Sequence, residues 1–162
     1  MQVKRGDAAL LLFYLDQAFG RRGWHGPTLS ALVRNVGVAE AMWRPSPGRH
    51  SVWELVLHAA FWKNTVRRRI TGDGSVRFPR SPANWPKPPG DPTARAWLDD
   101  VELLKAEHRK LVRTVSQFPA ARLFRKVGTT RFIPADQIAG IAAHDLYHAG
   151  QIGLIRKLWE TR

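Results

Sequence analysis

The sequence contains no cysteine. Neither a disulfide framework nor a thiolate metal site can form, and the chain cannot supply a thiol for its own chemistry. It also lacks any run of about 18 apolar residues, so no transmembrane helix is expected. The first residues are basic, but Asp7 and Asp16 interrupt the apolar stretch that follows, and no small-residue cleavage site comes after it. We therefore expect no signal peptide and a cytoplasmic protein.

Acidic residues are scarce, because 13 Asp and Glu stand against 26 Lys and Arg. The formal net charge of +13 would attract nucleic acid, membrane surfaces or anionic small molecules. The basic residues are spread along the chain, with the longest run at 67–69, and no nucleic-acid motif accompanies them. We interpret the charge as a solvated, arginine-rich surface; we expect no membrane partner and do not favour nucleic acid.

Helical patterns dominate what is present. Ser51 and Glu54 have the spacing of a capping box, and Pro134 suits the first turn of a helix. Shorter helical pieces are expected at 28–36 and 39–43. Apolar residues recur at helical spacing in four long segments, 7–19, 51–70, 93–118 and 134–159. We predict one all-α domain over residues 1–162, built as a four-helix bundle.

The second and third long helices are separated by a proline-rich loop. Residues 72–92 contain six prolines, which favours an extended conformation. Trp85 is expected to pin this loop to the body of the protein. The loop is either a functional lid or rim, or a packed surface connection. A second link, at 124–133, is expected to contain a strand-like turn.

His144 and His148 lie four residues apart on the predicted last helix. Side chains at this spacing are neighbours, with Cβ atoms about 5–6 Å apart. Imidazoles on an apolar face need a partner, and a metal ion is the leading candidate. His58, in the apolar run ELVLHAAFW, is the first choice for a third ligand and His108 the second. The alternative for His58 alone is a satisfied core histidine.

The other two histidines, His25 and His50, lie in predicted loops. The spacing of His144 and His148 alone is a weak signal, and the protease motif HExxH is absent because residue 145 is Asp. Asp145 would either orient a ligand or pair with an arginine, and of these we favour a surface salt bridge. Three imidazoles suit Zn²⁺ or Ni²⁺, with Fe²⁺ and Co²⁺ as alternatives.

Two paired segments resemble a known family. HDLYHAGQIGLIRKL (144–158) and SVWELVLHAAFW (51–62), with the further pieces WHGPTLSALV and NWPKPPG, look like the DinB/YfiT-like superfamily. The resemblance extends from about Trp24 to Leu158. It implies a four-helix bundle with a metal site at His58, His144 and His148, and frequent homodimers. Characterised relatives include thiol S-transferases and isomerases that use bacillithiol, mycothiol or glutathione.

The sequence therefore supports three functions. The first is a metal-dependent thiol S-transferase in stress or detoxification, in which Trp62, Tyr147 and Gln151 line the pocket and arginines hold the carboxylates of the thiol. Tyr147 and His108 are its candidate catalytic residues, although ordinary packing is an alternative for each of these side chains. The second function is a metal-dependent hydrolase that needs no thiol. The third is a non-enzymatic, stress-related binding protein with a basic surface.

Overall fold

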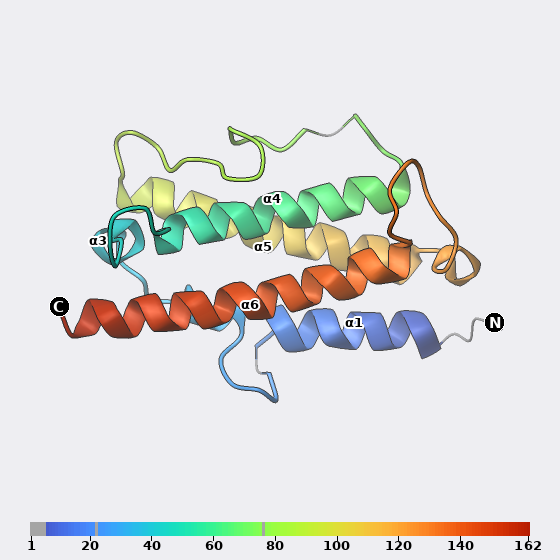
Figure 1. Cartoon of the computed structure of the whole chain (residues 1–162), viewed down its shortest axis with the longest axis horizontal. Helices are drawn as coiled ribbons and strands as arrows, with labels where there is room; N and C mark the ends of the chain where they lie inside the picture. Colours follow the sequence, from blue (N-terminus) through green and yellow to red (C-terminus); the bar gives the residue numbers. More distant parts are fainter. Residues whose placement is uncertain (1–5, 22, 76) are drawn as a thin grey trace.

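The computed structural model describes residues 6–21, 23–75 and 77–162, and every regular element in those ranges is a helix (Figure 1). The basic residues at the start of the chain and Arg22 lie outside the described ranges. No helix within them combines the length and the apolar composition that a membrane crossing requires.

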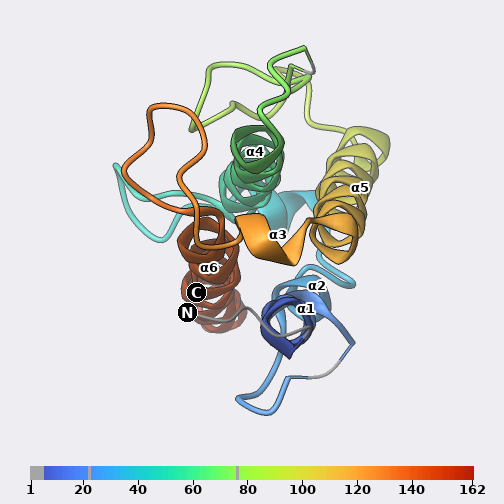
Figure 2. The ribbon, with the colours of Figure 1, turned by 90° about the vertical axis from the view of Figure 1, so that its right-hand side faces the viewer.

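Four long helices lie side by side (Figures 1 and 2). Each of them packs against two others: α1 and α4 contact both α5 and α6. Their bounds agree with the predicted segments to within one residue at each end. They are α1 (Gly6–Phe19), α4 (Val52–Thr71), α5 (Ala94–Gln117) and α6 (Pro134–Glu160).

Two short helices, α2 (Leu29–Leu32) and α3 (Val38–Met42), pack against the long ones. The prediction of a helix over 28–36 was too long. Thr28 caps α2 as expected, but Asn35 adopts the left-handed conformation, with φ of 60°, and breaks the helix before Gly37 caps α3. The link at 124–133 forms turns and bends rather than a strand.

Local sequence signals explain where the long helices begin and end. The capping box is present, because the Ser51 side chain accepts from the Glu54 N–H and the Glu54 side chain accepts from the Ser51 N–H. Helix α4 ends at Gly72, whose φ of 76° is the left-handed conformation that glycine adopts without strain. Pro134 lies in the first turn of α6, and the Asp136 carboxylate accepts from the backbone N–H of Ile133.

Helices α4 and α5 run in the same direction, so the chain between them must return along the whole length of α4 (Figure 1). A helix of 20 residues is about 30 Å long, which explains why the connection is long. It runs from Gly72 to Thr93 and contains no helix or strand in its described residues. Its path carries Asn84 and Trp85 across the middle of α4.

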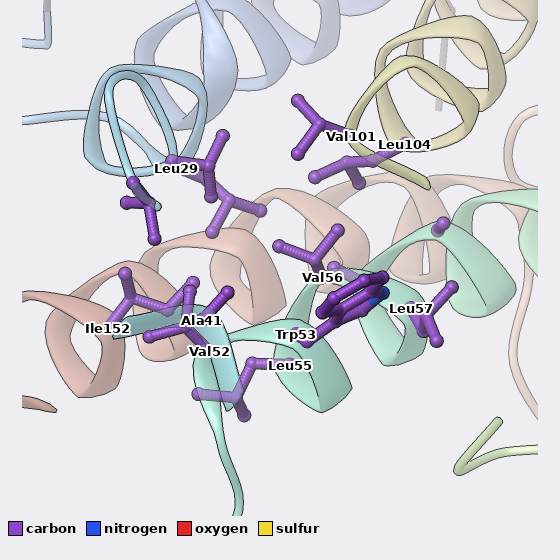
Figure 3. Close-up of a cluster of buried hydrophobic side chains, with 14 of the residues drawn as sticks. Leu29, Ala41, Val52, Trp53, Leu55, Val56, Leu57, Val101, Leu104 and Ile152 are labelled. Carbon is purple, nitrogen blue, oxygen red and sulfur yellow. The ribbon is translucent and has the colours of Figure 1, made fainter. Parts of the chain in front are cut away.

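The buried apolar side chains form two clusters. The first gathers Phe19 of α1 and residues of α2 to α6 around Trp53, Val56 and Leu104 (Figure 3). The second lies around Leu15, Leu111, Ile138 and other residues of α1, α4, α5 and α6. On α4, α5 and α6 a layer of buried polar residues separates the two clusters along the helix. These residues are Lys63, Asn64, Glu107, Asp145 and His148.

Candidate metal centre

Three histidines from two helices meet at one edge of this polar layer. Helix α4 supplies His58, and successive turns of α6 supply His144 and His148. The Nε2 atom of His144 lies 3.1 Å from the Nε2 atoms of both His58 and His148. Taking one ring nitrogen from each histidine, the three atoms all lie within 4.8 Å of one another.

The outer nitrogens of two of these rings are held by carbonyl oxygens. The Nδ1 atom of His58 lies 2.6 Å from the backbone oxygen of Asn84, and that of His148 lies 2.7 Å from Oε1 of Gln151. Because a carbonyl oxygen only accepts, each Nδ1 must carry the hydrogen. The Nε2 atom of each of these two rings is therefore unprotonated, and its lone pair faces the centre of the group. A histidine that binds a metal needs such a lone pair.

Burial keeps the three rings uncharged at neutral pH. Loss of solvation lowers the pKa of His58 to about 4, with the neighbouring His148 and His50 acting in the same direction and the bond to Asn84 opposing it. The pKa of His144 is lowered to about 3, also mainly by burial, and that of His148 is lowered for the same reason. Neutral imidazole is the form that binds a metal.

A metal ion would satisfy the three histidines better than hydrogen bonds among their rings can. His144 can donate at most one hydrogen from Nε2, yet it faces two nitrogens that have none to donate, and its buried Nδ1 has no partner. With Zn–N bonds of about 2.0–2.1 Å and tetrahedral angles, ligand nitrogens lie about 3.3 Å apart. The two 3.1 Å separations are close to that value. Three nitrogen ligands also leave a position open for water or substrate.

The connection between α4 and α5 covers one side of the centre. The ring of Trp85 stacks between His50 and His58, with centroid distances of 3.6 and 3.7 Å. Besides holding His58 through its backbone oxygen, Asn84 accepts a hydrogen bond from the Trp62 indole through its side chain, at 2.8 Å. The connection thus contributes directly to the support of His58, a candidate ligand.

One cavity borders the group of three histidines, and a second lies beside residues that contact them. A cavity of about 220 Å³ lies between α4 and α6 and is lined by Trp62, Phe132, His144 and neighbouring residues. Another, of about 320 Å³, is lined by His50, Gln151 and residues around them. A small substrate could approach His144 through the first of these without displacing Trp85.

The predicted surface salt bridge of Asp145 was wrong. Asp145 is fully buried and pairs with the equally buried Lys63 of α4. Burial raises the pKa of Asp145 and lowers that of Lys63, while their mutual attraction opposes both shifts. The pair joins the helix that carries His58 to the helix that carries His144 and His148.

Of the other predicted site residues, Trp62, Gln151 and Tyr147 lie near the three histidines, and His108 does not. Trp62 lines the cavity beside His144, and Gln151 contacts His148 directly. Tyr147 packs its ring against His148, at a centroid distance of 5.0 Å, but is 64% exposed. His108 lies outside the group of three and stacks on Phe19 of α1 at 4.0 Å.

Sequence reasoning missed Lys63 and the supporting role of Asn84. A signal for Lys63 existed, since residues 56, 63 and 70 are spaced by seven and lie on one buried face of α4. No comparable signal existed for Asn84, because its backbone oxygen reaches His58 only through the path of a long connection.

Comparison with known proteins agrees with this geometry. The family profile of the DinB superfamily matches residues 24–152, and the chain belongs to that superfamily, whose members are generally metal-dependent. No curated protein and no solved structure matches the chain significantly.

Proposed function

We propose that this chain is a metal-dependent thiol S-transferase, with His58, His144 and His148 as the ligands of one divalent ion, Zn²⁺ or Ni²⁺ in the first place. The observation that carries the proposal is the convergence of three neutral imidazoles. His58 and His148 are buried, and hydrogen bonds to carbonyl oxygens direct their Nε2 lone pairs inward, while His144 is half-buried. Such an ion, when bound, supplies a Lewis acid that lowers the pKa of a thiol or water in its open position. Since the chain has no cysteine, the thiol must come from a small molecule.

The chain's own residues would prepare the site for this chemistry. Asn84 and Gln151 fix the orientation of two ligand rings. Trp85 covers His58 and excludes water from that side. The cavity between Trp62 and His144 leaves room for the reacting end of a substrate.

The same proposal extends to the architecture. The four long helices would form the four-helix bundle that the superfamily implies, with the proline-rich connection as a cover over the metal centre. The protein would act in the cytoplasm, as a homodimer, in stress or detoxification.

Metal content tests the ligands. Elemental mass spectrometry on untagged protein should find about one metal per chain in the wild type and none in His58→Ala. His25→Ala is the matched control, because His25 is an exposed loop histidine outside the group of three, and it should keep its metal. Full occupancy in His58→Ala would refute the assignment.

Activity tests the reaction. Purified protein should conjugate bacillithiol, mycothiol or glutathione to at least one member of a panel of electrophiles, and His58→Ala should abolish that turnover. Turnover of esters, amides or lactones without added thiol would replace the transferase with a hydrolase. Absence of both, together with DNA affinity that falls steeply with salt, would favour a binding protein.

A further inference from the structure

The link that precedes α6 reaches towards the C-terminal end of α4 (Figure 1). A cleft of about 780 Å³ is lined by residues of these two segments. Three of its lining side chains are arginines, Arg68, Arg69 and Arg131, and three carry hydroxyl groups, Thr65, Thr129 and Thr130. The remaining lining residues are Phe61, 72–74, Val127, Gly128 and Phe132.

The net charge of the cleft lining is positive, because three arginines line it with a single carboxylate, which attracts Arg68. None of the ion pairs within the described ranges involves Arg68, Arg69 or Arg131. Asp73 is the one carboxylate among the lining residues, and its side chain accepts from the backbone N–H and the hydroxyl of Ser75, at 2.9 and 2.5 Å.

The three arginines differ in what they contact. Arg68 donates to the backbone oxygens of Asp73 and Gly74, at 3.3 and 3.2 Å, and so shapes the wall of the cleft. The guanidinium of Arg69 lies over the Trp62 ring, 5.4 Å from its centroid, and that of Arg131 lies 4.6 Å from the ring centroid of Phe132. Arg69 and Arg131 therefore keep their hydrogen-bond donors available for an anion.

This cleft is adjacent to the metal centre. Phe132 lines both the cleft and the cavity beside His144. The Trp62 ring that carries Arg69 lies 6.2 Å from the His144 ring, so the Arg69 guanidinium is at most about 12 Å from that histidine. A fully extended tripeptide spans about 11 Å. Arg69 therefore lies within about the length of one tripeptide-sized molecule of His144.

We propose that Arg69 and Arg131 bind the carboxylate end of the thiol, so that the enzyme uses a thiol of about tripeptide size that carries carboxylates, and not an uncharged thiol. Guanidinium groups recognise carboxylates through paired, charge-assisted hydrogen bonds. The proposal rests on the proposed function for the identity of the ligand, but the anion site itself needs no metal.

Calorimetric titration with S-methylglutathione tests the site, because the methyl cap removes the thiol and with it any need for a metal. Wild-type protein should bind this probe and should not bind its diethyl ester, which has the same backbone without the two carboxylates. The double variant R69Q/R131Q should weaken binding by about tenfold or more, given the strength of hydrogen bonds to charged groups. The control R113Q removes one exposed arginine of α5 that does not line the cleft, and it should bind within about twofold of wild type.

The same titration on His58→Ala separates the two proposals. Binding that persists in this variant supports the anion site whether or not the protein holds a metal. Failure of the wild type to bind the probe would overturn the anion site. That result would not bear on whether the three histidines bind a metal. Equal binding of the diethyl ester, or equal weakening by R113Q and R69Q/R131Q, would also overturn it.

Discussion

Replacing Lys63 with methionine should destabilise the protein severely. The side chains of Lys63 and Asp145 are both fully buried and are paired with each other across α4 and α6. Removing one partner of a buried pair costs about 3–5 kcal/mol, because the remaining charge has neither water nor a counter-ion. The second oxygen of Asp145 already lacks a hydrogen-bond partner, so nothing nearby would compensate for the loss of Lys63. Against a total stability of about 5–15 kcal/mol, this loss is large.

The double variant Lys63→Met/Asp145→Leu should recover most of that loss. Both charges are then gone. Methionine has nearly the volume of lysine, and leucine has the branched outline of aspartate with somewhat larger terminal groups. Apolar replacement of a whole buried pair is often neutral or stabilising. We expect the double variant to lie within about 1 kcal/mol of wild type or above it.

Urea unfolding followed by circular dichroism, on protein treated with a chelator, measures these differences without a contribution from bound metal. Asp99→Ala is the control, since it breaks an exposed pair with Arg95 four residues away on α5, and should cost about 0.5 kcal/mol or less. A loss below about 1 kcal/mol in Lys63→Met would refute the reasoning. A double variant no more stable than the single variant would refute it as well. The loss in Lys63→Met would then come from altered packing and not from an unpaired buried charge.

Two further predictions concern the histidines. In metal-free protein the pKa of His58 is lowered to about 4 and that of His144 to about 3, from the ordinary 6.5. Below pH 6.5 the unfolded chain therefore binds more protons than the folded one. The free energy of unfolding should fall as the pH is lowered from 6.5 towards 4. Urea titrations at several pH values would check this, and a fall of equal size in His58→Gln would contradict it. Replacing Gln151 with leucine removes the acceptor that orients His148 and should weaken metal affinity by about 10–100-fold in a competition assay with a chelating dye. An unchanged affinity would show that this hydrogen bond does not orient the ligand.

The layer of buried polar residues sets the position of the candidate metal centre along the helices. Apolar clusters lie on both sides of it and supply most of the burial that stabilises the fold. Within the layer, Asn64 donates to Glu107 on α5, and Lys63 pairs with Asp145 on α6. These contacts fix how α4 is positioned against its neighbours, and therefore where His58 lies relative to α6.

The long connection between α4 and α5 has a similar double role. It exists because two parallel helices need a return path of about 30 Å. On that path Trp85 stacks on His58, and Asn84 accepts a hydrogen bond from the same ring. A segment required by the topology is thus also part of the support of the candidate centre.

The sequence by itself determined the helices and the chemistry available to them. Apolar spacing, the capping box at Ser51 and Glu54, and Pro134 defined the long helices to within one residue, because these signals act over one or two turns. The pair His144 and His148 was visible for the same reason.

Only the tertiary structure decided what the helices bring together. It set His58 rather than His108 beside the pair on α6, paired Asp145 with Lys63 in the interior, and placed Asn84 on the outer nitrogen of His58. It also set Arg69 and Arg131, 62 residues apart in the chain, in the lining of one cleft. The physical reason is that each of these contacts depends on the packing angle and register of separate elements, which many residues determine jointly and no local pattern specifies.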